Sequence, residues 1–442
     1  MTPQDKAESF VRLLTAHRFA ELDAPLCAEQ KQVESGVLSE TELLHRWPQQ
    51  YLQRAELIPH ALAWTEACPN SYPAHCFMAT LQLGVAWQAR GIATSDNTSA
   101  KQFEVMQAHF DVASRHLRQA LKLSSVPTLA IAVGMRISRA GDGDAELDYF
   151  DLAQPLLPKS PHLCGLMLWA LNPKWGGSVQ ALTAFFERSK TWSGWSEQDR
   201  LQLQVDYLSE MADVCGCSGE AAQAQAYRVQ SQNLRPDSDD VLSQQADELA
   251  TQENYPAAVA CVERSIAHCP TAARLEKLAR YFEALHQTAP AVAAYERALF
   301  WGSGDAATRL IELHRERVGE PAMQERISLW GQHGLAQYAS RTMFLLGVIC
   351  YFDRPRADDK ARALQWWQQA AEWGDSTAEG NLGTGMRDLI QDLWFGRGIA
   401  KDRAAAQAWL AKLKTLDIDR YAEATAAIHN PWNIVKSWFP RA

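Results

Sequence analysis

The sequence predicts an all-α protein, a right-handed solenoid of stacked antiparallel helix pairs. Stretches rich in alanine, leucine and glutamine dominate the chain, whereas runs of valine, isoleucine and threonine of strand length are scarce. Within many segments, apolar residues recur three and four positions apart, which is the period of an amphipathic helix. Some features recur at intervals of 33 or 34 residues, as Pro236 and Pro270 do. Such an interval is typical of stacked helix pairs.

Composition and charge exclude several classes of protein. The 442 residues exceed one globular core, so the chain either divides into two or three domains or forms a repeat array. The formal net charge is -9 and no basic block or stripe is present, which argues against a nucleic-acid partner. No stretch approaches about 18 uncharged apolar residues, so we expect no membrane span.

The first residues and the cysteines indicate a compartment. The chain begins without the basic start and unbroken apolar core of a secretion signal. The nine cysteines are an odd number and are scattered through helical segments. Reduced, mostly buried thiols are therefore expected, and the protein is predicted to be cytoplasmic.

The clearest helix pair lies between Asp239 and Pro270. Its two facing apolar stripes consist of Leu242, Ala246, Leu249, Ala258, Val262 and Ile266. The small residues Ala246 and Ala258 stand where the two helices of a hairpin approach closely. This unit resembles a tetratricopeptide repeat, although Ser265 replaces the usual alanine. The next unit follows in phase, with stripes that consist of Leu275, Leu278, Ala279, Phe282, Ala291, Tyr295, Ala298 and Leu299.

The C-terminal stretch contains two related units. Asp359 precedes Trp366 by seven residues, and Asp402 precedes Trp409 by the same step. The aspartates suit helix N-caps, and the tryptophans fall on faces that pack against the neighbouring helix. Trp366, Trp367 and Trp409 are therefore expected to be core residues. These units resemble Sel1-like repeats. The first departs from the family pattern, because Asp353-Arg354-Pro355-Arg356 stands where a glycine-rich loop is expected.

The N-terminal half has a weaker signal of the same kind. An amphipathic stripe runs through residues 103–120, and Ser39 with Glu42 has the pattern of a capping box. We therefore expect degenerate helical hairpins here too. The polar loop over residues 92–99 is the best candidate for a mobile connection.

Two motifs of this half resemble an uncharacterised bacterial domain-of-unknown-function family. They are the helix end that carries Trp87 and Arg90-Gly91, and the run Pro173-Lys174-Trp175-Gly176-Gly177-Ser178. The resemblance covers roughly residues 1–235 and implies no biochemical activity. We thus predict three parts: an N-terminal helical domain (1–235), tetratricopeptide-like repeats (236–335), and Sel1-like repeats with a capping tail (336–442). The tail aromatics expected to cover the last helix pair are Trp432, Trp438 and Phe439.

The Trp175-Gly176-Gly177 motif has two interpretations. The glycines would let a ligand approach backbone amides at a helix start, with Trp175 as a stacking platform. Alternatively, the motif is a tight corner between helices, where Trp175 fills a gap and Gly176 takes a positive φ. A Gly-Gly pair alone is a weak phosphate signal, so the structural corner is favoured.

Metal and catalytic motifs are not evident. Cys68, His75 and Cys76 share one spacing with Cys261, His268 and Cys269, but each set offers three ligands without the short Cys-x2-Cys knuckle of structural zinc sites. The chain contains no Gly-x-Ser-x-Gly, no His-Glu-x-x-His and no phosphate-binding loop. We expect no metal, no cofactor and no catalytic residue.

The predicted function is a non-catalytic scaffold that holds a partner protein in a helical-repeat groove. Stacked hairpins line their concave face with the first helix of each pair. Positions of those helices that lie off the packing stripes, and are expected to be exposed, are Asp240, Asp247, Glu276, Arg280 and Glu283. This mainly acidic set favours a basic segment of the partner. The repeat resemblance implies, more narrowly, an immunity-type or secretion-accessory protein.

An alternative function belongs to another class. The protein would be an enzyme or a small-ligand receptor with its site near Trp87, Arg90 and Trp175, together with Gly176 and Gly177.

Overall fold

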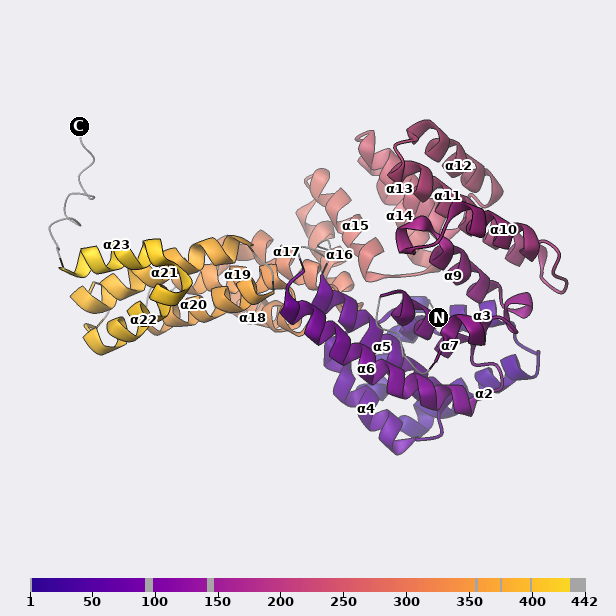
Figure 1. Ribbon diagram of the computed structural model, residues 1–442, viewed down its shortest axis with the longest axis horizontal. Coiled ribbons are helices and arrows are strands. Elements are labelled where there is room, and N and C mark those ends of the chain that lie inside the picture. The colour runs from indigo at the N-terminus through magenta and orange to yellow at the C-terminus, as the bar shows by residue number, and fades with distance from the viewer. Residues whose placement is uncertain are drawn as a thin grey trace. The chain divides into compact units, whose positions relative to one another are not determined.

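A computed structural model shows an all-helical protein (Figure 1). It describes residues 2–91, 98–140, 147–353, 357–373, 376–397 and 400–429. The structure is 81% helical, and no strand occurs among the described residues, which confirms the predicted fold class. None of the described helices is both long and apolar enough to cross a membrane. Residues singled out above that lie outside the described part are 92–97, 354–356, Trp432, Trp438 and Phe439.

The chain consists of two compact units. Unit 1 comprises Met1–Trp87 and Val105–Ser303, and unit 2 comprises Gln88–Glu104 and Gly304–Ala442. The boundaries expected near residues 235 and 335 both fall inside a unit. The repeat hairpins explain the first of these, because the same helix-pair architecture continues on both sides of residue 235.

The helices of unit 1 alternate with short connections. They are α1 (Pro3–Thr15), α2 (Phe19–Glu34), α3 (Glu40–Arg46), η1 (Pro48–Tyr51), η2 (Ala55–Leu57), α4 (Ile58–Ala67), α7 (Thr128–Arg139), α8 (Tyr149–Ala153), η4 (Leu157–Lys159), α9 (Pro161–Leu171), η5 (Pro173–Trp175), α10 (Val179–Ser189), α11 (Glu197–Cys217), α12 (Ala221–Leu234), α13 (Asp239–Thr251), α14 (Tyr255–His268), α15 (Ala272–Ala284) and α16 (Thr288–Phe300). Two helices include residues of both units, namely α5 (Tyr72–Arg90) and α6 (Ala100–Leu123).

Unit 2 contains the C-terminal hairpins. Its elements are α17 (Gly304–His314), η6 (Arg315–Arg317), α18 (Pro321–Ala336), α19 (Ser340–Val348), the π-helical turn η7 (Ile349–Asp353), α20 (Ala357–Glu372), α21 (Ser376–Phe395), α22 (Arg403–Leu416) and α23 (Ile418–His429).

Capping residues fix several helix starts. Ser39 and Glu42 form the predicted capping box at α3, with the Glu42 backbone nitrogen 3.1 Å from the Ser39 hydroxyl oxygen. Asp402 caps α22 as predicted. Asp359, in contrast, does not cap α20, because this helix already begins at Ala357. The seven-residue step from aspartate to tryptophan therefore starts at an N-cap in α22 but inside the helix in α20.

The predicted hairpins are present in unit 1. Helix α13 packs on α14, α15 packs on α16, and α11 with α12 forms an equivalent pair before them. Ala246 and Ala258 are fully buried at the close approach of α13 and α14. Ser265 is also fully buried, and its hydroxyl donates to the Asp239 carbonyl oxygen at 2.6 Å. This hydrogen bond satisfies the polar group that replaces the usual alanine.

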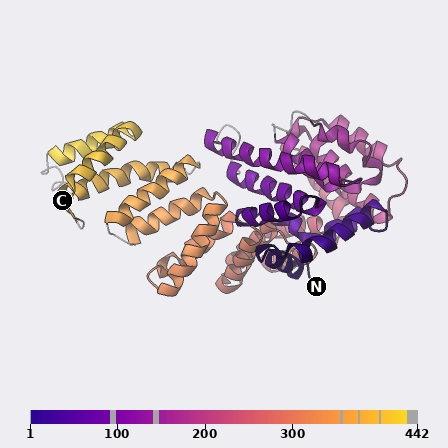
Figure 2. The same cartoon turned by 90° about the horizontal axis from the view of Figure 1, so that it is seen from below.

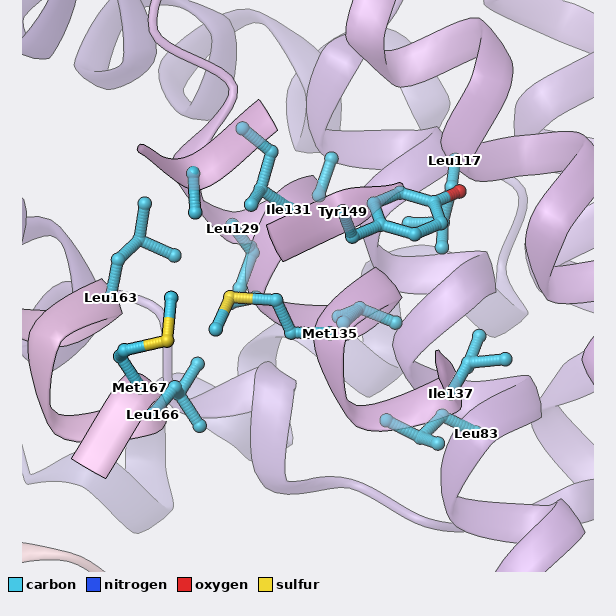
Figure 3. Packing of buried hydrophobic residues seen from close by; sticks show 14 of the residues in the cluster. Leu83, Leu117, Leu129, Ile131, Met135, Ile137, Tyr149, Leu163, Leu166 and Met167 are labelled. Atoms are coloured by element: carbon cyan, nitrogen blue, oxygen red, sulfur yellow. The ribbon is translucent and has the colours of Figure 1, made fainter. Parts of the chain in front are cut away.

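The N-terminal half is held by a large apolar cluster (Figure 3). Tyr149, at the start of α8, is fully buried and lies next to Leu117 of α6. A Cβ atom at Gly134 would stand 2.1 Å from the Tyr149 ring, so glycine alone gives the ring room against α7. Met135, Leu163 and other apolar side chains of α7 and α9 complete the cluster, which is the core behind the candidate site.

The first and last elements of unit 1 meet (Figure 2). Trp301, which follows α16, is fully buried, and its indole nitrogen donates to the Gln4 side-chain oxygen of α1 at 2.7 Å. The Gln53 backbone nitrogen donates to the Trp301 carbonyl oxygen at 3.2 Å. Gly302 has φ +98°, and a Cβ there would stand 2.5 Å from the Gln53 carbonyl carbon. Unit 1 is therefore a closed arrangement rather than an open-ended stack.

Of the three tryptophans expected in the core of unit 2, one is fully packed. Trp367 is the buried core residue, and its indole nitrogen donates to the Phe344 carbonyl oxygen at 3.2 Å. Gly347 of α19 gives it room, since a Cβ there would stand 2.5 Å from the ring. Trp366 and Trp409 are only half-buried. The packing face of α20 is thus one position further along than the sequence step indicated.

The close contact between α13 and α14 is testable. We expect Ala258→Trp to destabilise the protein by about 1–3 kcal/mol or more, because overpacking a tight contact forces the helices apart. Ala260→Trp is the matched control, since Ala260 lies on the same helix and is exposed. Thermal or urea unfolding measures both. Equal stability of the two variants would contradict the repeat register.

Candidate functional site

A polar pocket of about 600 Å³ lies within unit 1. Its volume falls in the range of ligand-binding sites, roughly 300–1,000 Å³. Three helices that lie side by side, α9, α11 and α13, form much of its lining (Figure 1). Further lining residues come from the start of α1, from α3, from the end of η1, from the last turn of α7, from Arg235 after α12 and from the C-terminal end of α14. Five carboxylates and two arginines line the pocket: Asp199, Asp206, Glu210, Asp239, Asp240, Arg136 and Arg235.

Helix α11 presents a polar stripe to the pocket. Gln202, Asp206 and Glu210 are spaced four residues apart, which places them on one helix face. The Gln202 amide donates to Asp206 at 2.8 Å, and the Asn172 amide donates to Glu210 at 2.7 Å. A Cβ atom at Gly165 of α9 would stand 2.8 Å from an Asp206 oxygen, so glycine there lets α9 approach this carboxylate.

The negative charge of this stripe is poorly compensated. Amide groups, not cations, bond Asp206 and Glu210. The pKa of Asp206 is raised to about 7, chiefly by burial and also by the neighbouring carboxylates of Asp240 and Glu210, while Gln202 and Arg235 act in the opposite direction. Burial also raises the pKa of Glu210. A cation placed beside these carboxylates would stabilise their ionised forms.

Helix α13 adds Asp239 and Asp240. Arg274 of the next hairpin donates to Asp240 at 2.7 Å, and its guanidinium lies 2.8 Å from Asp239. The Asp240 side chain is 60% exposed, but it is exposed to the pocket, where protein surrounds it. Burial and the adjacent Asp239 therefore raise the pKa of Asp240 despite Arg274. We call Asp206, Glu210 and Asp240 the acidic wall.

Arg136 stands elsewhere on the lining, near the end of α7. Tyr51 of η1 and His162 of α9 line the same pocket and interact with Arg136 electrostatically. Burial lowers the pKa of His162 to about 3, and the charge of Arg136 contributes, so this imidazole is neutral at pH 7. Burial raises the pKa of Tyr51, which is therefore a neutral phenol. The pocket thus has an acidic wall and a separate cationic group.

Of the five predicted groove residues, one lines the pocket, namely Asp240. Asp247 is exposed but accepts from the Lys277 ammonium at 2.7 Å and the Tyr281 hydroxyl at 2.9 Å, which joins α13 to α15. Arg280 is exposed as expected. The Asp247 contacts stabilise the stack of hairpins, so charge reversal there would not leave stability unchanged.

The expectation that all five are exposed is wrong for Glu276 and Glu283. Both are half-buried. Glu276 accepts a hydrogen bond from the Ser303 hydroxyl, and Glu283 accepts one from the Tyr295 hydroxyl at 3.0 Å. These carboxylates lie off the apolar stripes, yet they bond the following helix or turn. A partner-binding role for them stays a prediction.

The Trp175-Gly176-Gly177 motif forms a corner between α9 and α10. Gly176 has φ +84°, in the left-handed region, and a Cβ at Gly177 would stand 2.0 Å from the Leu171 carbonyl oxygen. Trp175 packs against Trp169, with ring centroids 5.0 Å apart. The glycines are needed by the backbone itself, which supports the structural interpretation.

The other members of the alternative site have separate surroundings. Trp87 packs edge-on against Phe110 in the apolar cluster, with ring centroids 6.5 Å apart. Arg90 belongs to unit 2, where its carbonyl oxygen accepts from the Gln102 amide at 2.9 Å. Trp175 lies in the corner between α9 and α10 and packs against Trp169.

The cysteine and histidine sets have packing roles. His75 bonds the Pro69 carbonyl oxygen through one ring nitrogen and His116 through the other, at 3.0 and 2.9 Å. All nine cysteines are free thiols, of which three are buried. In the described part of the chain, no three His, Cys, Asp or Glu side chains are grouped so that they would hold a metal ion.

Sequence reasoning missed most of the pocket. For Asp206 and Glu210, the sequence feature that could have indicated a site is two acidic residues four positions apart on one helix. For Arg136 the signal is a charge directly after seven apolar or glycine residues, Leu129–Met135, all of which are buried. Neither signal tells which helices face each other, so the pocket required the structure.

Comparison with known proteins gives one partial family match. Residues 7–142 match a domain of unknown function (DUF4034). The match lies in the N-terminal half, where the resemblance was predicted, but it ends before the run Pro173–Ser178. No curated protein sequence matches the chain.

Solved structures with similar folds include three proteins of low sequence identity. The protective antigen c5321 of uropathogenic Escherichia coli, which displays an SLR fold, is 15% identical; the alignment covers 91% of this chain and 90% of that one, with a TM-score of 0.41. The human IFIT1 dimer with PPP-AAAA is 12% identical, with 80% and 94% covered and a TM-score of 0.38. Cut9, from the APC/C hetero-tetramer Cut9-Hcn1, is 13% identical, with 92% and 91% covered and a TM-score of 0.33.

The corner between α9 and α10 yields a paired prediction. Gly177→Ala is expected to destabilise the protein by about 1–3 kcal/mol or more, because the new methyl group overlaps a backbone carbonyl that cannot move away. Gly216→Ala is the control: nothing lies within 4 Å of its Cβ, and its place in α11 favours alanine by up to about 1 kcal/mol. Chemical unfolding distinguishes the two, and a Gly177→Ala protein as stable as the wild type would refute this corner geometry.

Proposed function

We propose that the protein is a non-catalytic helical-repeat scaffold that holds a basic segment of a partner protein in the pocket of unit 1. The observation that carries the proposal is the acidic wall. Its Asp206 and Glu210 carboxylates lie inside a pocket of about 600 Å³ and are bonded by amides rather than by cations. A lysine or arginine side chain supplies the missing positive charge.

The position of the wall within the fold supports a protein partner. Helices α11 and α13 are the first helices of their hairpins, and these are the helices that line the concave face of a helical-repeat array. The wall is continuous with further polar side chains of the same two helices, Ser209 and Gln244, which are hydrogen-bonded to each other at 2.9 Å. Such a surface offers hydrogen-bonding groups to a peptide backbone on either side of the basic residue.

A small-ligand receptor is the second candidate. The pocket lining includes Pro3 of α1 and Tyr51 of η1, from the segments that the closure of unit 1 joins, and its volume suits a drug-sized molecule. A thermal-shift screen with cationic metabolites, such as polyamines and basic amino acids, separates this function from the first. A scaffold gains little stability from such molecules, whereas a receptor is stabilised by its ligand at concentrations above its Kd.

A peptide array tests the proposed function. The full chain is applied to random peptides that are attached through their N-termini and end in free carboxylates. Recovered peptides should be enriched in lysine and arginine. The double variant Asp206→Asn/Asp240→Asn should bind them at least about tenfold more weakly, because removing one partner of a desolvated charge pair typically costs 2–5 kcal/mol. Arg274 keeps Asp239 as its partner in this variant.

The matched control is Asp213→Asn/Asp237→Asn, which removes the same charges from exposed positions outside the pocket. It should bind the peptides as the wild type does. Peptides without a basic preference, or equal loss in both double variants, would contradict the proposal.

Peptide binding should also depend on pH near neutrality. A cation binds the ionised form of Asp206, whose pKa burial raises to about 7. This carboxylate is mostly protonated at pH 6 and mostly ionised at pH 8, so affinity for a lysine-containing peptide should rise over this interval. The groups that face Asp206 are Gln202, Glu210, Arg235 and Asp240. Asp206→Asn should flatten the profile, and an unchanged slope in this variant would assign the titration to another group.

A further inference from the structure

Arg136 is an unpaired cation inside the pocket. It lies near the C-terminal end of α7, a helix whose nine buried residues anchor it in the apolar cluster. Its side chain is open to the pocket, although protein surrounds it. Among the described residues, no carboxylate forms a salt bridge with Arg136, and no hydrogen bond engages its guanidinium. A guanidinium in such surroundings leaves five donors for a bound group.

Neighbouring groups favour an anion at this place. Tyr51 and His162 line the same pocket as Arg136, interact with it electrostatically and are both neutral, so neither cancels its charge. His162 offers a ring N–H donor, and the Tyr51 hydroxyl, which bonds the Cys269 thiol, can turn to a bound anion. Tyr51 comes from η1, and its position depends on the backbone bond between Gln53 and Trp301 that closes unit 1. The three side chains therefore come from three elements that the fold holds together.

We propose that Arg136, with Tyr51 and His162, binds the C-terminal carboxylate of the partner segment whose basic side chain lies against the acidic wall. This inference rests on the proposed function, and it makes the ligand of the pocket bipolar. A peptide C-terminus with a basic residue close to it pairs with both charged parts of the lining, because its carboxylate binds Arg136 and its basic side chain binds the acidic wall. An interior stretch of basic chain satisfies only the wall.

A carboxylate fits this place better than a phosphate group. A planar guanidinium binds a carboxylate through two parallel hydrogen bonds, and one charge neutralises the other. A phosphate monoester carries about -1.5 to -2 charges at pH 7. Five carboxylates already line the pocket, so the second charge of a phosphate would be repelled. The pocket volume also limits the ligand to a few residues, which favours a chain end.

The test compares peptides that differ only in their end groups. The lysine-containing sequences that the array recovers are synthesised as free acids, as C-terminal amides, and as amides with an aspartate added at the last position. Binding to the full-length wild-type chain is measured by calorimetry at pH 8. The free acid should bind at least about tenfold more tightly than the amide. The aspartate amide should bind no better than the plain amide, because its carboxylate has a different reach.

Variants assign the effect to Arg136. In Arg136→Gln the preference for the free acid over the amide should fall below about twofold, while binding of the amide stays as in the wild type. Arg136→Lys should retain part of the preference, since it keeps the charge but loses the two-pronged geometry. Arg228→Gln, on α12 outside the pocket, is the control and should keep the full preference. Circular dichroism melting confirms that each variant is folded.

The outcomes separate this inference from the proposed function. If acid and amide bind the wild type equally, the terminal carboxylate is not recognised, yet a basic preference would leave the scaffold function standing. If the aspartate amide restores tight binding, a side-chain carboxylate replaces the terminus and the proposal is overturned. If the acid is preferred but replacing lysine by norleucine changes nothing, the acidic-wall function fails and the carboxylate site remains. The contrast between acid and amide on the wild type requires no mutation.

Discussion

The contact between Trp301 and Gln4 is the constraint on which the pocket depends. A helical-repeat array is normally held by contacts between neighbours alone, and its two ends are free. In unit 1 a buried indole after α16 bonds the first helix, and the adjacent backbone of Gln53 joins the same place. The bond from Gln53 also fixes the segment that follows η1. This segment adjoins Tyr51, so the bond helps to hold Tyr51 on the pocket lining. Pro3 of α1 and Tyr51 of η1, which face α11 and α13 across the pocket lining, belong to the segments that this closure joins.

The charge of the pocket lining depends on which carboxylates are paired with cations of the protein itself. Arg274 is nearly buried and serves both Asp239 and Asp240 from the following hairpin. Asp206 and Glu210, which lie one turn apart on α11, receive amide donors instead. Burial raises the pKa values of Asp206 and Glu210, and within the described part of the chain no cation is paired with either carboxylate to offset this effect. Burying charge in this way lowers stability, and such arrangements are typical of functional sites.

The fold was predictable because its signals are local. Stripes of apolar residues define helices, small residues such as Ala246 and Ala258 mark close contacts, and a fixed interval marks the repeat. Errors arose where one residue of register decides burial: Trp367 rather than Trp366 enters the core, and α20 begins before Asp359. Exposure of Glu276 and Glu283 was misjudged because hydroxyl donors on the next element turn toward them.

Most residues of the candidate site could not be predicted from the sequence. Asp240 was singled out as a groove residue because α13 belongs to a recognisable repeat, and it lines the pocket; its role in partner binding stays a prediction. Arg136, Asp206 and Tyr51 come from segments without a clear repeat pattern. They meet only because the chain curves and closes on itself, and no periodicity records which helices face each other. A glycine such as Gly165, which admits the Asp206 carboxylate, is likewise uninformative until its neighbour is known.

The closure also sets an order of events during synthesis. Gln4 leaves the ribosome long before Trp301, and at about 5–20 residues per second the interval is roughly 15–60 s. Helices α1 and η1 therefore remain without their final partner while α7 to α16 are being made. The Gln4 side chain and the Gln53 backbone nitrogen are open to solvent during that time, whereas Phe10 of α1 can already pack against Trp64 of α4. Elongation rate, and not only thermodynamic stability, consequently governs how much of the nascent chain reaches the closed form.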